Sequence, residues 1–137
     1  MSNAPSIQSA CTILVPGWMD NDRTLTRLRA FLELSGVRAV ICSPQPSDGS
    51  VPIQRLAEQL AAFIESGFGA DEPVNLFGFS MGGLIHRVYL QEMDGWQRVR
   101  KFVTVATPHR GTMTARIASR MIVQEAWLQM RPESDFI

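Results

Sequence analysis

Several features that would define a specialised protein are missing from this 137-residue sequence. Its 13 basic and 13 acidic residues cancel, and no block of like charge occurs. Nucleic acid and anionic membrane surfaces are therefore not expected partners. No apolar run approaches the ~18 residues that a transmembrane helix needs, so we expect no transmembrane segment.

Cysteine and histidine are also scarce, with two of each. Cys11, Cys42, His86 and His109 are scattered without ligand spacing, so no metal site and no cofactor are expected. We place Cys11 at the start of one strand and Cys42 at the end of its parallel neighbour, roughly 15 Å apart. A disulfide needs Cα atoms within about 7 Å, so the sequence predicts two free, mostly buried thiols.

The N-terminal residues 1–10 lack the basic start and apolar core of a signal peptide. We therefore expect a cytoplasmic protein, with a trimmed secreted form as the alternative. Hydrophobic residues make up 45% and charged residues 19% of the chain, which is typical of a globular protein. The length predicts one domain over residues 1–137.

Apolar runs and helical patterns alternate along the chain. Strands are expected over 11–15, 37–41, 74–79 and 101–106, and helices are expected to start near Asn21 or Asp22, at Ser50 and after Ser80, and to end at Gly36, Gly67 and Gly95. The apolar face of the first helix is Leu25, Leu28, Phe31 and Leu32, and that of the second is Ile53, Leu56, Ala57, Leu60, Phe63 and Ile64. Right-handed crossovers then predict an α/β fold, a parallel sheet of about four strands with helices on both faces.

The most informative motif is G-x-S-x-G, formed by Gly78, Ser80 and Gly82 between a predicted strand and a predicted helix. This context is typical of a nucleophile elbow, where the serine hydroxyl stands above the sheet. The two glycines avoid side chains where strand and helix close on each other. The backbone N–H of Met81, in the first helical turn, is a candidate oxyanion donor.

The chain resembles the α/β-hydrolase family, in particular small bacterial lipases and esterases. Three segments carry the resemblance: 13–18 (ILVPGW), 78–83 (GFSMGG) and 102–112 (FVTVATPHRGT). Pro16 stands where the family normally has histidine. Trp18 follows Pro16 and Gly17, and its backbone N–H is the candidate second oxyanion donor; simple packing is the alternative role for this residue.

The resemblance also implies what should follow the fourth strand. Residues 112–131 are a candidate lid or cap, with an ordinary covering helix as the equal alternative. The strands that would carry the catalytic acid and histidine are expected beyond residue 137, so the chain looks C-terminally truncated. The implied strand order is second, first, third, fourth. The fourth strand would then be an apolar edge that invites self-association.

The catalytic base is the weakest part of this assignment. His86 lies six residues after Ser80 in the predicted helix that follows the serine, and it is turned away from Ser80. We therefore expect it to be a surface or groove histidine. His109 follows the fourth strand on the same rim as Ser80, but the family has a structural loop there, so it is a low-probability base. Glu133 and Asp135 have no histidine after them and are not convincing catalytic acids.

Two functions therefore remain open. The first is a serine hydrolase of carboxylic esters, acting on an acyl-ester or lipid substrate through an acyl-enzyme on Ser80, and weakly active or inactive as this chain. The second is a non-catalytic binding or scaffold module that retains the elbow as architecture.

Overall fold

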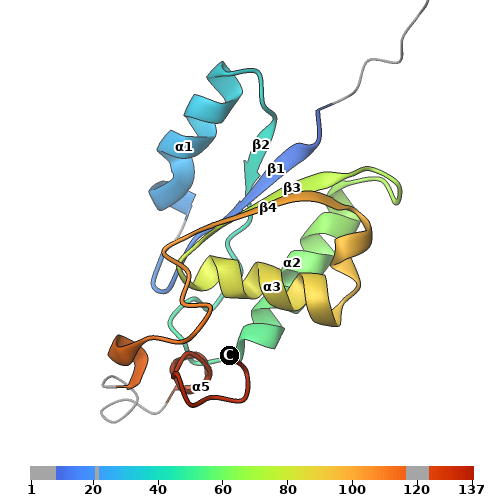
Figure 1. Ribbon diagram of the computed structural model, residues 1–137. Helices are drawn as coiled ribbons and strands as arrows, with labels where there is room; N and C mark the ends of the chain where they lie inside the picture. Colours follow the sequence, from blue (N-terminus) through green and yellow to red (C-terminus); the bar gives the residue numbers. More distant parts are fainter. Residues whose placement is uncertain (1–8, 21, 117–123) are drawn as a thin grey trace, which may run out of the picture.

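The computed structural model describes residues 9–20, 22–116 and 124–137. Its four strands form one parallel sheet in the order β2-β1-β3-β4, which confirms the predicted fold class and strand order (Figure 1). The strands are β1 (Cys11–Val15), β2 (Ala39–Ile41), β3 (Val74–Phe79) and β4 (Val99–Val105).

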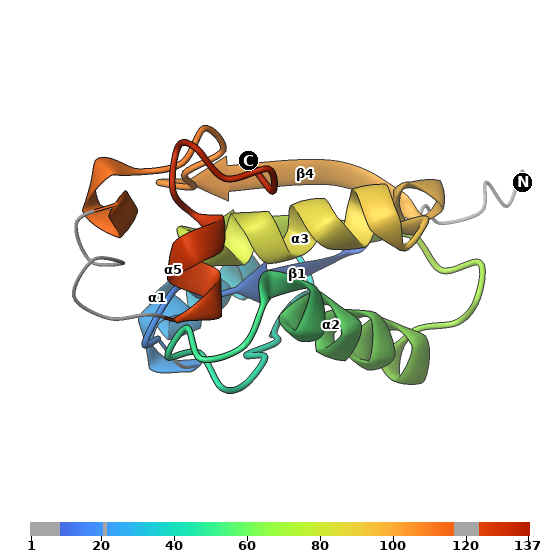
Figure 2. The same ribbon diagram turned by 90° about the horizontal axis from the view of Figure 1, so that it is seen from below.

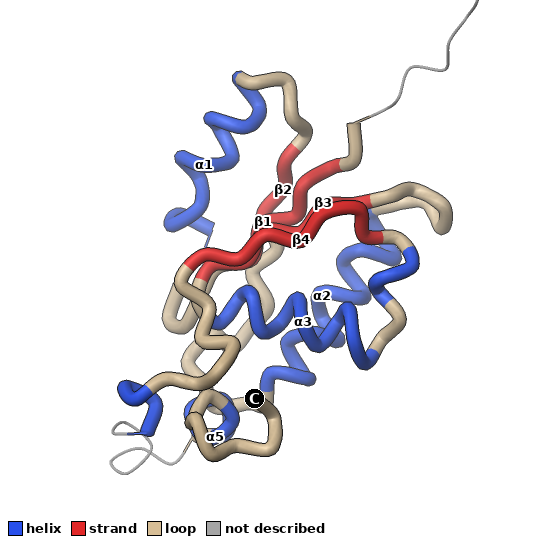
Figure 3. The backbone as a smooth tube through the Cα atoms, viewed as in Figure 1, coloured by secondary structure: helices blue, strands red, loops and turns tan. Residues whose placement is uncertain are grey.

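Helices cover the two faces of the sheet unequally. The helices are α1 (Asp22–Leu34), α2 (Ile53–Gly67), α3 (Met81–Glu92), a short 3-10 helix η1 (Gly95–Gln97) and α5 (Glu125–Gln129). Figure 1 and Figure 3 show α2 and α3 on one face and α1 on the other. The larger core lies under α2 and α3, where Leu56, Leu60, Leu84 and Ile85 are fully buried.

The face under α1 has a much smaller core, built around Leu14, Leu25 and Ala39. The predicted apolar face of α1 is partly wrong, because Phe31 is 64% exposed. The sheet on this side extends past α1 to β4, and no helix of the described residues covers this far strand (Figure 1).

Two predicted helix boundaries differ from the observed ones. Ser50 does not cap α2; its hydroxyl bonds the Asp48 carboxylate, and Pro52 precedes the first helical residue. The first amide of α2, at Ile53, is instead satisfied by the side chain of Gln129, 2.7 Å away. The elbow helix ends at Glu92, before Gly95. The proposed cap Asn21 lies outside the described residues.

The structure tests the prediction for the two thiols and bears on the one for membrane-spanning segments. Among the described residues neither Cys11 nor Cys42 is in a disulfide, and both are buried, as expected. Burial raises the pKa of the Cys11 thiol, which favours its neutral form. Within the described residues, no helix is long and apolar enough to cross a membrane.

Candidate active site

Ser80 stands between β3 and α3 in an unusual backbone conformation. Its φ is 52° and its ψ is −122°, outside the regions that non-glycine residues commonly occupy. The turn leaves no room beside it: a Cβ on Gly78 would lie 2.5 Å from the Cα of Gly83. Such strain persists only where the surrounding structure holds it, and it commonly marks a functional site.

The loop after β1 packs directly against this turn. A side chain at Gly82 would overlap the carbonyl oxygens of Val15 and Pro16. A Cβ on Gly17 would lie 2.9 Å from the Cβ of Ser80 and 3.4 Å from its hydroxyl oxygen. The end of β1 is therefore in contact with the serine.

Two backbone amides, one in the loop after β1 and one in the turn after β3, have no backbone acceptor among the described residues. Met81 is the first residue of α3, so its N–H has no partner within the helix. Within the described residues, neither Met81 nor Trp18 donates its backbone N–H to another backbone group. The Trp18 indole is held separately, by donation to the carbonyl oxygen of Asp48 at 2.8 Å. Both amides remain candidate oxyanion donors.

Sequence reasoning missed Thr107, which holds the elbow from the loop after β4. Its hydroxyl donates to the Ser80 carbonyl oxygen at 2.9 Å. The same side chain fills the space where a Cβ on Gly83 would stand. The signal was present in the sequence, since Thr107 directly follows the fourth strand, but only the tertiary fold shows what its hydroxyl contacts.

Ser80 opens into a mostly apolar cavity of about 250 Å³. Its lining includes Trp18, Asp20, Phe79, Ala106, Pro108, Thr112, Thr114, Trp127 and Met130. The rings of Trp18 and Trp127 meet edge to face, with centroids 4.9 Å apart. The cavity therefore joins the loop after β1, the elbow, the loop after β4 and α5.

His109 follows β4 as Ser80 follows β3, but its ring bonds another residue. Its Nε2 is 3.0 Å from the hydroxyl oxygen of Thr104, within hydrogen-bond distance. Burial, with a smaller contribution from the Arg87 guanidinium, lowers the pKa of its imidazole. Within the described residues, no hydrogen bond joins His109 to Ser80.

The expectation for His86 was wrong. It is not a surface or groove histidine: its exposed fraction is 0%. Its ring packs against Phe102 with centroids 6.0 Å apart, and neither ring nitrogen has a partner among the described residues. Burial lowers the pKa of His86 to about 3, so the ring is neutral at pH 7. Helix α3 is buried more completely than its sequence pattern indicated.

The acidic residues near the C-terminus, Glu133 and Asp135, were not convincing catalytic acids in the sequence. Glu133 forms an ion pair with Arg116 at 3.0 Å, and Asp135 is exposed. Neither of them lines the cavity beside Ser80. Asp20 does line that cavity, and it accepts a hydrogen bond from the Thr24 hydroxyl at 2.7 Å.

The described part of the candidate lid is attached to the body of the protein. Residues 113–116 are helical; Ile117, Met121 and Ile122 lie outside the described residues. α5 rests against α2, where Gln129 caps Ile53 and donates to the side chain of Gln54 at 2.6 Å. Figure 2 shows α5 beside the ends of α2 and α3. Whether residues 112–131 act as a lid stays a prediction.

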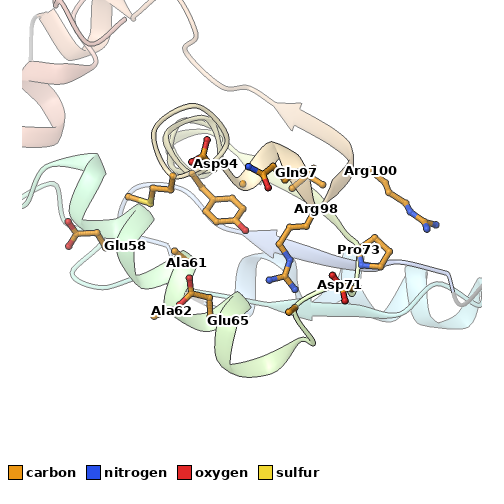
Figure 4. A pocket seen from close by; sticks show the side chains of 15 residues that line it. Glu58, Ala61, Ala62, Glu65, Asp71, Pro73, Asp94, Gln97, Arg98 and Arg100 are labelled. Atoms are coloured by element: carbon orange, nitrogen blue, oxygen red, sulfur yellow. The ribbon is translucent and has the colours of Figure 1, made fainter.

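A larger, more polar cavity of about 830 Å³ lies at the opposite ends of the strands (Figure 4). Its lining includes the acids Glu58, Glu65, Asp71 and Asp94 and the bases Arg98 and Arg100. The Arg98 guanidinium donates a hydrogen bond to the Gly69 carbonyl oxygen at 2.6 Å. Because it lies before β3 and β4 rather than after them, this cavity is separate from Ser80.

The strand order, the elbow and the position of Ser80 at the carboxyl end of β3 define an α/β-hydrolase fold, and solved hydrolases share it. The chain belongs to the palmitoyl protein thioesterase family, whose model matches residues 13–135. No curated protein matches the chain significantly.

Crystal structures of the lipase BlEst2 from Bacillus licheniformis have the same fold. The mature lipase superposes with a TM-score of 0.72 at 19% identity, covering 95% of this chain and 58% of the lipase. The propeptide form gives a TM-score of 0.73 at 18% identity, covering 95% of this chain and 31% of that one.

An extracellular α/β-hydrolase from a Paenibacillus species is also similar. It superposes with a TM-score of 0.66 at 12% identity, covering 82% of this chain and 50% of the hydrolase. This chain therefore spans about half the length of these hydrolases.

Proposed function

We propose that this chain carries the nucleophile and oxyanion site of a serine hydrolase that cleaves carboxylic esters or thioesters. The observation that supports this most strongly is the conformation of Ser80, at φ 52° and ψ −122°, beside an apolar cavity. This backbone conformation costs free energy, and residues held in such conformations cluster at functional sites. Membership of the palmitoyl protein thioesterase family supports the same chemistry.

In this proposal the Ser80 hydroxyl oxygen attacks the carbonyl carbon of the acyl group. The carbonyl oxygen gains negative charge and is stabilised by the backbone N–H groups of Met81 and Trp18. Each such donor contributes about 3 kcal/mol to transition-state stabilisation in serine hydrolases. The alcohol or thiol departs with a proton, and water then releases the acid from the acyl-serine.

The acyl chain is proposed to lie in the cavity between Trp18, Phe79 and Trp127. The aromatic and aliphatic lining suits a hydrocarbon chain. Its volume of about 250 Å³ falls below the roughly 300–1,000 Å³ usual for larger ligands. The described residues therefore favour a short acyl group as the substrate of this chain.

Turnover also requires a base, and neither histidine of the described residues contacts Ser80. A serine hydroxyl is a weak nucleophile until its proton is removed. We therefore propose that the chain by itself reacts slowly, at the residual level that binding and an oxyanion hole support. A base supplied by further polypeptide would restore full activity.

Labelling with a fluorophosphonate tests the nucleophile without requiring turnover. Mass spectrometry should locate the adduct on Ser80, and Ser80→Ala should remove it. Ser134→Ala, a substitution near the C-terminus outside the cavity, is the matched control and should keep the label. An adduct that persists in Ser80→Ala would remove Ser80 from the mechanism.

The absence of a histidine beside Ser80 favours a second candidate function, a non-catalytic binding module that uses the same cavity. Such a module would bind a fatty acid or acyl ester without forming an adduct at Ser80. Binding of a short-chain fatty acid that is unchanged in Ser80→Ala, together with no fluorophosphonate labelling, would favour this alternative.

A further inference from the structure

The backbone N–H of Trp18, a candidate oxyanion donor, lies in a turn whose conformation its own sequence does not favour. The N–H of Asp20 donates to the Gly17 carbonyl oxygen at 3.2 Å, which closes a four-residue turn. Met19, the third residue of this turn, has a φ of 56°. Glycine is usual at such a position, because a side chain there crowds the backbone. The Met19 side chain is 62% exposed, so packing contributes little to holding the conformation.

The loop between β2 and α2 (residues 42–52) supplies hydrogen bonds that hold this turn. The N–H of Met19 donates to the Ser47 carbonyl oxygen at 2.7 Å. In return, the Ser47 hydroxyl donates to the Asp20 carbonyl oxygen at 3.0 Å. Ser47 is therefore bonded, through its backbone and through its side chain, to the two residues that follow Trp18.

The β2–α2 loop also contacts both tryptophans of the cavity beside Ser80. The carbonyl oxygen of Asp48 accepts the bond from the Trp18 indole at 2.8 Å. A Cβ on Gly49 would lie 3.2 Å from the indole nitrogen of Trp18 and 3.3 Å from Cδ1 of Trp127. Among the described residues, none of this loop lines the cavity itself. The loop can therefore act on the chemistry only through the residues that it holds in place.

Helix α2 anchors the loop to the body of the protein. The Gln59 side chain accepts a hydrogen bond from the Gln45 N–H at 2.9 Å and donates one to the Gln45 carbonyl oxygen. The side chain of Gln45 in turn accepts a bond from the Ser47 N–H at 3.2 Å. On its inner face α2 is fixed in the larger core, where Leu56 and Leu60 are fully buried. The position of Ser47 is thus set by an element that does not reach the cavity.

We propose that the β2–α2 loop sets the position of the Trp18 backbone N–H, and that Ser47 is a positioning residue for the reaction at Ser80. This inference rests on the proposed function, because it concerns the same oxyanion site. An oxyanion donor is effective when its N–H already points at the oxygen before the reaction. A displacement of about 1 Å can slow a reaction by ~10²-fold. The strained turn around Met19 needs the loop to hold the amide that closely.

The variant Ser47→Ala removes the hydroxyl that bonds the Asp20 carbonyl oxygen and leaves the cavity lining unchanged. The rate constant for labelling of Ser80 by an alkyl fluorophosphonate should fall about tenfold, because the phosphoryl oxygen occupies the oxyanion site. Ser47→Thr retains the hydroxyl and should label within about twofold of the native rate. The matched control is Ser66→Ala, at an exposed serine of α2 whose hydroxyl bonds the Phe63 carbonyl oxygen at 3.2 Å. This control should label at the native rate.

Amide hydrogen exchange, followed by NMR, tests the positioning without any reaction at Ser80. The Met19 N–H bonds Ser47, so it should exchange slowly in the native chain and about fivefold faster in Ser47→Ala. Ser66→Ala should leave this exchange unchanged. The faster exchange should be confined to residues 17–20, whereas a general loss of stability would also speed exchange in the core strands.

The two measurements separate failure of this inference from failure of the proposed function. If the native chain is labelled, equal labelling rates for the native chain and Ser47→Ala would overturn the role of Ser47 and leave the proposed function intact. Slowing by Ser47→Thr as large as that by Ser47→Ala would also overturn it, because the hydroxyl would not be the cause. A native chain that is not labelled at Ser80 would remove the proposed function. The positioning of the Trp18 amide is then decided by exchange, and equal Met19 exchange in the native chain and Ser47→Ala would overturn it.

Discussion

The hydroxyl of Thr107 donates to the carbonyl oxygen of Ser80 at 2.9 Å, which joins residues on two different strand ends. The same carbonyl accepts a bond from the Gly83 N–H at 3.1 Å, and the Ser80 N–H donates to Val105. Ser80 is therefore held on both sides of its peptide. These three bonds offset the cost of its unusual backbone conformation.

Thr107→Val should destabilise the fold by about 1 kcal/mol, because it removes one hydroxyl donor while keeping the shape of the side chain. The free energy of unfolding, measured by urea denaturation, gives the value. Thr107→Ser retains the hydroxyl and is the control for the hydrogen bond. An unchanged stability in Thr107→Val would show that the bond to the Ser80 carbonyl contributes nothing.

Gly82→Val should be much more damaging, with a loss of about 3 kcal/mol or more, because its side chain would overlap the carbonyl oxygens of Val15 and Pro16. The control is Gly67→Ala, at a glycine whose Cβ would meet no atom within 4 Å. Thermal unfolding should separate the two variants clearly. A Gly82→Val protein that melts with the native chain would contradict the tight turn.

His86 should make the fold sensitive to acid. Its pKa is lowered from 6.5 to about 3 by burial. As pH falls below 6.5 the unfolded chain binds a proton at this residue and the folded chain does not, so stability decreases by about 1.4 kcal/mol per pH unit down to about pH 3. Denaturant titrations of the native chain and His86→Leu should therefore diverge between these values.

The variant His86→Leu also removes two buried ring nitrogens that have no partner among the described residues. It should gain about 2 kcal/mol over the native chain at pH 5, relative to their difference at pH 7. Equal pH slopes for the two proteins would mean that His86 is protonated in the folded state or paired by an unseen group.

The chain should hydrolyse a short-chain nitrophenyl ester only slowly, since among the described residues no histidine forms a hydrogen bond with Ser80. Ser80→Ala should remove the slow reaction, whereas His109→Ala should leave its rate within about twofold because Nε2 is engaged with Thr104. Initial rates of the purified proteins provide the measurement. Fast turnover that is lost in both variants would make His109 the catalytic base.

Local sequence patterns predicted the sheet well. The run from Val74 to Phe79 gave the bounds of β3 as observed, because its apolar residues end at the turn that Gly78 and Ser80 mark in the sequence. The glycines around Ser80 likewise indicated a tight turn. Helix boundaries were less certain, since Ser50 bonds its own loop and leaves the cap of α2 to Gln129.

What the sequence by itself determined was the alternation of strands and helices, the position of the elbow and the apolar character of β4, because these depend on periodicity and neighbouring residues. Only the tertiary structure decided that Thr107 supports Ser80, that Gln129 caps α2 and that His86 is buried beneath Phe102. Each of these joins segments far apart in the chain. Such contacts depend on how elements pack against one another, and a local sequence pattern does not encode which distant segments meet.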